Sequence, residues 1–261
     1  MTDRKRLPIA VIDSGVGGIS VLSELIRLMP NENYIYFGDS ANAPYGTKSR
    51  AEVLKITENN VELLINKGIK AAVIACNTAT SAAAKAIREK YPSLIVIGIE
   101  PAIKPAAELC AAPRVLVMAT PLTLNEEKFC ALAKRFSDKE EIIPLPCDGL
   151  SELVERGELS GEVINTYLDA LFAPYKDEKI DAIVLGCTHY PHVKAAIAER
   201  FGREVAILDG GEGTARETRR RLEADGLLCE TAGKGSVEII NTSGEARLIE
   251  LSRSLLNKMM Q

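Results

Sequence analysis

Short apolar runs alternate along the chain with longer segments in which apolar residues recur at helical spacing. The runs that predict β-strands lie at residues 9–12, 34–37, 72–75, 94–97, 115–118, 141–145, 182–185, 205–208 and 237–240. Several of them, such as 182–185, are apolar at every position, which is typical of parallel strands buried on both faces. The pattern therefore predicts strands in the interior of mostly parallel sheets.

Helices are predicted between these runs, among them residues 18–28, 50–67, 81–90, 123–135, 161–173, 192–200, 214–224 and 245–259. In the segment 50–67 the apolar residues keep largely to one face, as a helix packed on a sheet requires. The alternation of strands and helices favours an α/β fold with helices on both faces of parallel sheets.

Composition and charge narrow the class of protein. With 261 residues, of which 46% are apolar and 26% charged, the chain matches a globular protein of two ordinary domains or one large one. The formal net charge of −4 gives no support for nucleic-acid binding. No apolar stretch approaches the roughly 20 residues that span a bilayer, and no signal-type apolar core follows the basic start. We expect a cytoplasmic protein with neither nucleic-acid nor membrane partners.

The cysteines lie far apart in the sequence, at positions 76, 110, 130, 147, 187 and 229. No Cys-x-x-Cys motif occurs, so the spacing indicates neither a zinc ribbon nor a thioredoxin-type redox pair. Reduced thiols are therefore expected. We interpret Cys110, Cys130, Cys147 and Cys229 as small residues of the core or of helices.

Cys76 and Cys187 differ from the other cysteines because their surroundings match. Each follows a predicted strand and a small residue, and each precedes small polar residues that we place at the start of a helix. Ligands of open α/β sheets bind at the carboxyl ends of strands, and helix N-termini favour anions, so Thr78, Thr188 and nearby N–H groups can hold a carboxylate. Two matched thiols suit a reaction that removes a proton from one face of a carbon and returns it on the other. The alternative for either cysteine alone is a buried, inert thiol.

Other polar motifs leave alternatives open. The glycine-rich residues 13–18 fit neither the dinucleotide-binding nor the P-loop motif, and a capped strand–helix turn is the alternative. For residues 38–46, which are dense in turn formers, a surface loop is the simpler interpretation. His189 and His192 beside Cys187 lack a second ligand cluster, so no metal is expected. A hydrolase with a single Cys–His pair would leave the other cysteine unexplained.

Jointly, the loop motifs resemble those of the glutamate racemase family, and they follow the family's order across nearly the whole chain. They are Asp13-Ser14-Gly15-Val16-Gly17-Gly18, Tyr36-Phe37-Gly38-Asp39, Pro44-Tyr45-Gly46, Ala75-Cys76-Asn77-Thr78-Ala79, Gly98-Ile99-Glu100-Pro101-Ala102 and Gly186-Cys187-Thr188-His189-Tyr190-Pro191. The resemblance implies a racemase without a cofactor, built from two similar three-layer α/β lobes with the active site in the cleft between them. It also implies that the product, D-glutamate, supplies bacterial peptidoglycan.

Motif by motif, the resemblance assigns roles to residues of this chain. Cys76 and Cys187 match the catalytic thiols, with Cys76 taking the proton from D-glutamate and Cys187 from L-glutamate. Asp13 is expected to assist Cys76, whereas Glu155 and His189 are expected to assist Cys187. The substrate-contacting set comprises Asp13, Ser14, Tyr45, Gly46, Asn77, Thr78, Thr188 and His189.

Some points stay open within the resemblance. Glu152 lies close enough to Glu155 in the sequence to be the acidic helper instead. Gly210 stands where many family members have a serine, which puts a polar contact of that loop in doubt. A homodimer is a further hypothesis. Aspartate racemase, a related amino-acid racemase and a non-catalytic amino-acid-binding protein are the alternative functions.

The resemblance also predicts the domain organisation. One lobe should comprise residues 1–98 completed by 209–261, and the other residues 99–208. The matching settings of Cys76 and Cys187, and a second echo between residues 11–15 and 207–211, agree with two similar lobes. Short motif pairs of this kind also arise by chance, so they do not establish the repeat by themselves.

Overall fold

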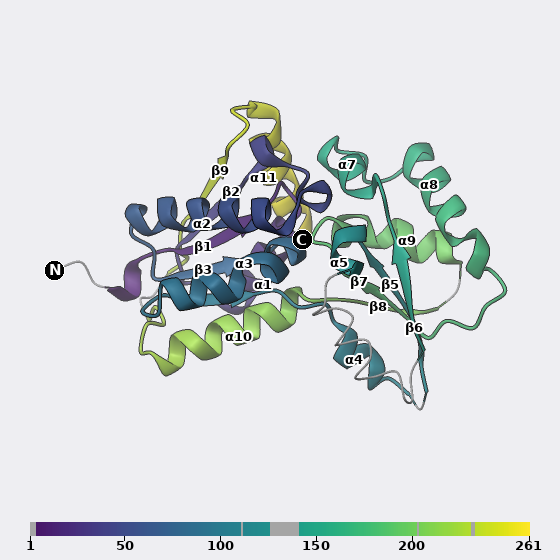
Figure 1. Ribbon diagram of the computed structural model, residues 1–261, viewed down its shortest axis with the longest axis horizontal. Helices are drawn as coiled ribbons and strands as arrows, with labels where there is room; N and C mark the ends of the chain where they lie inside the picture. Colours follow the sequence, from purple (N-terminus) through teal and green to yellow (C-terminus); the bar gives the residue numbers. More distant parts are fainter. Residues whose placement is uncertain (1–3, 111, 126–140, 203, 231–232) are drawn as a thin grey trace. The chain divides into compact units, whose positions relative to one another are not determined.

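Two units, each built on a parallel β-sheet, make up the chain in the computed structural model (Figure 1). The structure describes residues 4–110, 112–125, 141–202, 204–230 and 233–261. One unit comprises Met1–Glu100 and Gly211–Gln261, and the other comprises Pro101–Gly210. The strands are β1 (Ile9–Asp13), β2 (Tyr34–Gly38), β3 (Ala71–Ile74), β4 (Ile95–Gly98), β5 (Arg114–Ala119), β6 (Glu141–Pro146), β7 (Ala182–Leu185), β8 (Ala206–Asp209) and β9 (Val237–Asn241). The α-helices are α1 (Ile19–Leu28), α2 (Arg50–Lys67), α3 (Asn77–Lys90), α4 (Ile103–Ala107), α5 (Pro121–Asn125), α7 (Leu150–Glu155), α8 (Glu162–Phe172), α9 (Lys194–Phe201), α10 (Gly211–Ala224) and α11 (Ala246–Met260).

The sheet of the first unit has the strand order β4-β3-β1-β2-β9, and every neighbouring pair is parallel. All residues of β1 and β2 are buried, as expected for apolar strands covered on both faces. On one face, Ile12, Phe37 and Ile74 share a core with α2 and α3. On the other face, the hydroxyl of Tyr34 donates to the backbone oxygen of Leu25 in α1 at 2.9 Å. Helices therefore cover both faces, which confirms the predicted parallel α/β arrangement.

The helix α2 shows how local sequence fixes the two ends of an element. At its start, Ser49 Oγ accepts from the N–H of Glu52 at 3.3 Å, and the Glu52 carboxylate accepts from the N–H of Ser49 at 2.9 Å. This reciprocal capping box satisfies two N–H groups that the helix itself leaves free. At its end, Gly68 has a φ of 85°, the left-handed conformation that favours glycine. The observed bounds coincide with the predicted helix 50–67.

The sheet of the second unit has the order β6-β5-β7-β8 and is likewise parallel throughout. Val117 of β5 and Val184 of β7 belong to a core that includes residues of α4. The alternate side chain Leu116 is also buried, so the opposite face of the sheet is covered as well. Phe172 of α8 and Phe201 of α9 meet edge to face with ring centroids 5.4 Å apart, which packs these two helices together.

The observed helices differ from the predicted ones at several points. The helix α3 begins at Asn77 and not at residue 81, because its first turn is polar and yet buried. Of the predicted helix 123–135, the structure describes only the end of α5, and the remaining residues lie outside the described part of the chain. Helices α4 and α7 are too short to display a periodicity, so the sequence pattern does not predict them. No helix of the described residues combines the length and apolarity needed to cross a bilayer.

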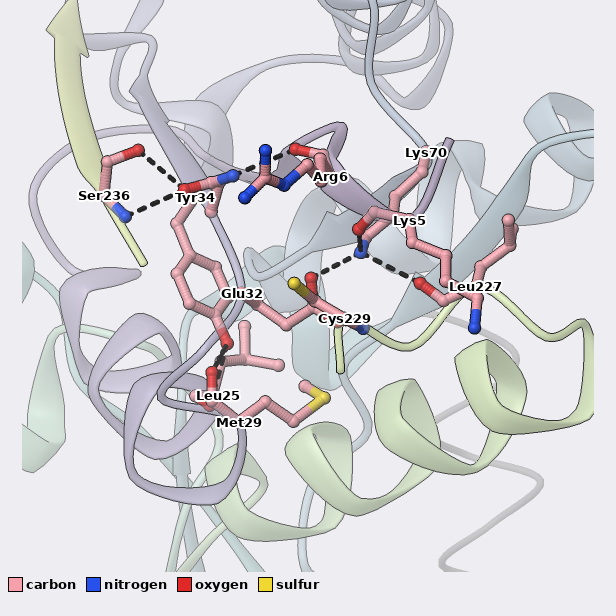
Figure 2. A network of polar contacts seen from close by, with 11 residues as sticks. Lys5, Arg6, Leu25, Met29, Glu32, Tyr34, Lys70, Leu227, Cys229 and Ser236 are labelled. Atoms are coloured by element: carbon pink, nitrogen blue, oxygen red, sulfur yellow. Dashed lines mark hydrogen bonds and ion pairs between the residues drawn. The ribbon is translucent and has the colours of Figure 1, made fainter. Parts of the chain in front are cut away.

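A buried ion pair links the segments that lead into the strands of the first sheet (Figure 2). Lys70, directly before β3, pairs with Glu32, just before β2, and their side chains are 0% and 2% exposed. Lys70 Nζ also donates to the backbone oxygens of Lys5 and Leu227, the latter at 3.0 Å, while Glu32 Oε1 accepts from the N–H of Cys229 at 2.8 Å. The pair thus joins the segment before β1 to the loop after α10. Removing one partner of such a pair leaves the other charge buried without a counter-charge, which lowers the free energy of unfolding by about 3–5 kcal/mol.

Candidate active site

Cys76 and Cys187 each follow a strand at the point where the connections of its sheet reverse direction. From β1 the chain passes through α1 to β2 on one side, whereas from β3 it passes through α3 to β4 on the other. The second sheet repeats this order, with β5 and β7 as the diverging neighbours. Ligands of open α/β sheets bind at such switch points, outside the carboxyl ends of the strands. Each thiol therefore lies at the position where its own unit is expected to bind a ligand.

The same topology corrects one of the two sequence echoes. Cys76 after β3 and Cys187 after β7 occupy equivalent positions in their sheets. Asp13 and Asp209 do not, because Asp13 ends the central strand β1 whereas Asp209 ends the edge strand β8. The equivalent of β1 in the second unit is β5. The likeness between residues 11–15 and 207–211 therefore does not reflect a structural repeat.

In the first unit, Asp13 is held beneath the start of α1. Its carboxylate accepts from the N–H of Gly15 at 3.1 Å, and its side chain is buried. A Cβ atom on Gly18 would lie 2.7 Å from the Asp13 Cβ and 3.1 Å from the Cβ of Ala75, the residue before Cys76. Glycine at position 18 thus lets the helix start approach both the carboxylate and the end of β3.

Cys76 is the N-cap of α3, which agrees with the helix start that we placed after this cysteine, and the first turn of the helix is polar. Asn77, Thr78 and Ser14 are 7%, 5% and 8% exposed. The Asn77 Oδ1 atom is buried and accepts no hydrogen bond from any described residue. Because a buried carbonyl oxygen without a donor is unfavourable, this atom marks a place where a ligand with an N–H or O–H group would be stabilised.

Tyr45 is fixed by a carboxylate that lies deep in the first unit. Its hydroxyl donates to Asp39 Oδ2 at 2.6 Å, and Asp39 also accepts from Asn60 Nδ2 at 2.9 Å and from Thr242 Oγ1 at 2.8 Å. Burial, the hydrogen bond to Asp39 and the negative charges of Asp39, Cys76 and Asp13 raise the pKa of Tyr45. Tyr45 therefore stays a neutral phenol.

The interpretation of residues 38–46 as a surface loop is wrong for its two key side chains, because Asp39 is 0% and Tyr45 3% exposed. Gly46 follows within the 3₁₀-helix Tyr45–Thr47 and is half-buried. The loop is folded inward by the hydrogen bonds that Asp39 accepts. Two of the donors lie outside this loop, Asn60 on α2 and Thr242 directly after β9.

In the second unit, Cys187 lies beside two polar side chains. Ser151 Oγ and His189 Nδ1 are each 3.6 Å from its sulfur. The other ring nitrogen of His189, Nε2, is 2.7 Å from Glu155 Oε1. Glu155, and not Glu152, is therefore the carboxylate in contact with the histidine.

The surroundings of His189 favour its protonated form. Burial by itself would lower the pKa of His189, but hydrogen bonds to Cys187 and Glu155 and the charges of both groups raise it well above 6.5. As an imidazolium, the ring donates from Nε2 to Glu155 and from Nδ1 to Cys187. The site can thus stabilise a thiolate at position 187 with a side-chain cation.

A helix N-terminus does not follow Cys187, contrary to the prediction. The backbone oxygen of Cys187 accepts from the N–H of Tyr190 at 3.2 Å, which forms a tight turn, and a short 3₁₀-helix, Tyr190–Val193, comes next. Pro191 within it has no N–H to donate, and α9 begins only at Lys194. Thr188 is nevertheless buried at 3% exposure beside the thiol. The surroundings of the two thiols therefore differ, with a helix start at Cys76 and a histidine at Cys187.

Residues that the motifs did not single out also gather at these strand ends. Thr120 directly follows β5, the strand beside β7, and its Oγ1 lies 3.0 Å from Thr123 Oγ1. Ser151 on α7 contacts Cys187, as described above. Hydroxyl side chains directly after an apolar strand are the signal that would have identified Thr120, whereas nothing local distinguishes Ser151.

The cysteines of the described residues form no disulfide. Cys147 and Cys229 are buried, in agreement with the prediction of small core residues. Cys110, by contrast, is exposed in a bend after α4, so its interpretation as a core or helix residue is wrong. Cys130 lies outside the described residues. Among the residues that the structure describes, no three side chains of His, Cys, Asp and Glu are grouped so that they could hold a metal ion.

Comparisons with known proteins show which proteins this chain resembles. The sequence model of the family described as Asp/Glu/Hydantoin racemase matches residues 9–218. Curated relatives named glutamate racemase, from Clostridium botulinum (strain Alaska E43 / Type E3) and Clostridium perfringens (strain ATCC 13124), are each 50% identical over 254 residues, covering 97% of this chain and 98% of theirs.

Solved structures of similar proteins cover almost the whole chain. Glutamate racemase from Francisella tularensis in complex with D-glutamate is 31% identical with a TM-score of 0.83, over 98% of this chain and 96% of that one. Escherichia coli glutamate racemase in complex with L-glutamate and the activator UDP-MurNAc-Ala is 30% identical with a TM-score of 0.84, over 97% and 95%. The strand and helix arrangement described above is therefore one that these structures share.

Proposed function

Because the chain belongs to the Asp/Glu/Hydantoin racemase family, we propose that it is a glutamate racemase that interconverts L- and D-glutamate without a cofactor. The names of the curated relatives and the glutamate bound in the solved structures support this substrate. Its product would be cytoplasmic D-glutamate for peptidoglycan. We propose glutamate as the substrate, and not aspartate, because a relative of 50% identity is named glutamate racemase.

The observation that carries this proposal is the pair of thiols that form no disulfide, each at the carboxyl end of a strand at the switch point of its sheet. Racemisation needs a base on one face of the α-carbon and an acid on the other, and the two groups exchange roles with direction. Cys76 and Cys187 provide two such groups of one chemical kind. A binding protein would need neither.

For L-glutamate, we propose that Cys187 acts as the thiolate and Cys76 as the thiol. The bond from the α-carbon to its hydrogen breaks, the proton passes to the Cys187 sulfur, and the electron pair stays on the carbon. The Cys76 thiol then gives its proton to the opposite face, which leaves Cys76 as the thiolate. For D-glutamate each step runs in reverse. Asp13 near Cys76, and His189 with Glu155 near Cys187, are proposed to return protons to their starting positions.

The carbanion has no pyridoxal group to accept its charge, so the protein must stabilise it by hydrogen bonds and charge. The N-terminus of α3, with Cys76 as its N-cap, favours a carboxylate because the positive end of the helix dipole lies there. The unpartnered Asn77 Oδ1 suits the substrate's ammonium group as an acceptor. Ser14, Tyr45, Gly46, Thr78 and Thr188 are proposed to complete the contacts.

The function is tested by incubating the protein with L- or D-glutamate and following optical rotation. Activity should be the same with a chelator and with a carbonyl reagent that blocks pyridoxal phosphate. Glutamine should have a kcat/KM lower by roughly 10²-fold or more, because a site built to pair a second carboxylate is left with unpaired groups. Racemisation of aspartate alone, or activity that returns only with added metal or pyridoxal, would contradict the proposal.

A pH dependence follows from the raised pKa of His189. The imidazolium is fully present below the ordinary histidine pKa, and its charge is lost as pH rises through the raised value. We therefore expect kcat/KM for glutamate to fall on the alkaline side, where the cation that supports the Cys187 thiolate disappears. Glu155→Gln removes a charge that raises this pKa, so the fall should move to lower pH.

The matched control is Glu152→Gln, a change of the same kind on an exposed residue of the same helix. Its pH profile should coincide with that of the unaltered protein. An alkaline limb that does not move in Glu155→Gln would show that the Glu155–His189 contact does not govern this titration.

A further inference from the structure

The helix α7 supports Cys187 in two ways at once. Ser151 and Glu155 are four residues apart in this helix and so lie on the same face. Ser151 Oγ is 3.6 Å from the Cys187 sulfur, and Glu155 contacts His189, whose Nδ1 is 3.6 Å from the same sulfur. The direct neighbours of the thiol thus include a serine hydroxyl for which the proposed mechanism has no role so far.

The two neighbours of Cys187 differ in what they can exchange with it. A protonated His189 has N–H groups only, so it can donate to a thiolate but cannot accept from a thiol. The Ser151 hydroxyl has both a hydrogen to donate and lone pairs that accept. In a racemase each thiol alternates between the two protonation states in every turnover. Ser151 is the neighbour whose hydrogen bond can follow that change.

The groups around Ser151, other than Cys187, do not change their protonation state during the reaction. The second neighbour of Ser151 is Tyr190, whose pKa is raised mainly by burial and then by the charge of Cys187. The Tyr190 hydroxyl donates to the backbone oxygen of Cys147 at 3.3 Å. Burial, together with the charge of Cys187, also raises the pKa of Cys147, whose thiol donates to Leu145 at 3.3 Å. Both groups remain protonated, so Ser151 changes only the direction of its hydrogen bond.

We propose that Ser151 is a catalytic residue whose hydroxyl donates to the Cys187 thiolate before it takes the α-proton and accepts from the Cys187 thiol afterwards. This inference rests on the proposed function, because it requires Cys187 to be one of the two bases. The helix α7 then supplies Ser151 as a partner of the Cys187 sulfur and Glu155 as the partner of His189.

The test compares Ser151→Val with Ser151→Thr, two side chains of the same shape of which only threonine keeps the hydroxyl. Loss of one hydrogen bond to a charged sulfur should lower kcat/KM about 10-fold in Ser151→Val, whereas Ser151→Thr should stay within about threefold of the unaltered protein. Because L- and D-glutamate have equal free energy, kcat/KM must change by the same factor in both directions. Thermal unfolding checks that both variants fold. Ser151→Ala, which also lacks the hydroxyl and creates no steric conflict, replaces Ser151→Val if that variant does not fold, and the unaltered protein is the reference if Ser151→Thr does not fold.

Isotope effects separate a role at Cys187 from a general structural effect. Deuterium on the α-carbon of L-glutamate slows abstraction by Cys187, and deuterium on D-glutamate slows abstraction by Cys76. In Ser151→Val the isotope effect on kcat/KM should rise for L-glutamate and fall for D-glutamate, because the Cys187 step becomes limiting. Ser151→Thr should retain both original values.

Each outcome of this experiment decides the inference. Equal kcat/KM values for the valine and threonine variants, or isotope effects that move together for the two enantiomers, would overturn the role of Ser151 while leaving glutamate racemisation intact. If the unaltered protein does not racemise glutamate, the proposed function itself fails, and this inference fails with it.

Discussion

Replacing either Cys76 or Cys187 by serine should reduce glutamate racemisation on the order of 10³-fold or more. A hydroxyl is a far weaker acid than a thiol, so the variant cannot hold the anionic base that takes the α-proton. The change removes little volume and leaves both strand ends as they are, so the protein should still fold. Loss of activity in both variants, and not in one alone, is the expected result because each direction of the reaction uses both groups.

The controls are the same substitution at two other cysteines. Cys229→Ser alters a buried thiol of the first unit and Cys110→Ser an exposed thiol of the second. Both should racemise at nearly the original rate. Optical rotation and exchange of the α-hydrogen with deuterated water measure the two steps separately. A serine variant of Cys76 or Cys187 that racemises as fast as these controls would refute the assignment of its thiol.

The strands could be predicted because of how parallel sheets are covered. Each central strand is buried on both faces, so apolar residues occupy consecutive positions and the run is visible in the sequence. Apolar periodicity could not predict the start of α3, for the opposite reason. Asn77, Thr78 and Thr80 are buried although polar, with Thr80 Oγ1 donating to the backbone oxygen of Ile74 at 3.0 Å, so the helix begins without an apolar period.

The candidate site was predictable to the extent that it follows the strands. Cys76, Cys187 and Asp13 come directly after apolar runs, and the motif order linked them to a known family. The contacts that hold the site were not predictable, because they join distant segments. Ser151 and Glu155 lie 36 and 34 residues from their partners Cys187 and His189, and Asp39 sits in a segment that reads as a surface loop. Hydrogen bonds between segments that are far apart in the sequence leave no periodic pattern in it.

The same two serine variants should respond in opposite ways to a substrate that can react after a single proton abstraction. Glutamate with chlorine on its β-carbon can lose the α-proton to a base and release chloride. The resulting enamine becomes an imine and hydrolyses to 2-oxoglutarate and ammonia. This elimination needs one base and no acid on the opposite face. A variant that retains one thiol should therefore still eliminate chloride from one enantiomer.

The resemblance assigns Cys76 to the D enantiomer and Cys187 to the L enantiomer, which fixes the expected pattern. Cys187→Ser should form 2-oxoglutarate from 3-chloro-D-glutamate only, and Cys76→Ser from 3-chloro-L-glutamate only, each at a rate close to that of the unaltered protein. The preference should be nearly complete, because a thiol on one face of the α-carbon cannot reach a hydrogen on the other. Elimination from the same enantiomer in both variants would mean that a single base serves both faces, and a reversed pattern would exchange the roles of the two cysteines. One thiol for each face of the α-carbon requires that the two variants eliminate chloride from opposite enantiomers.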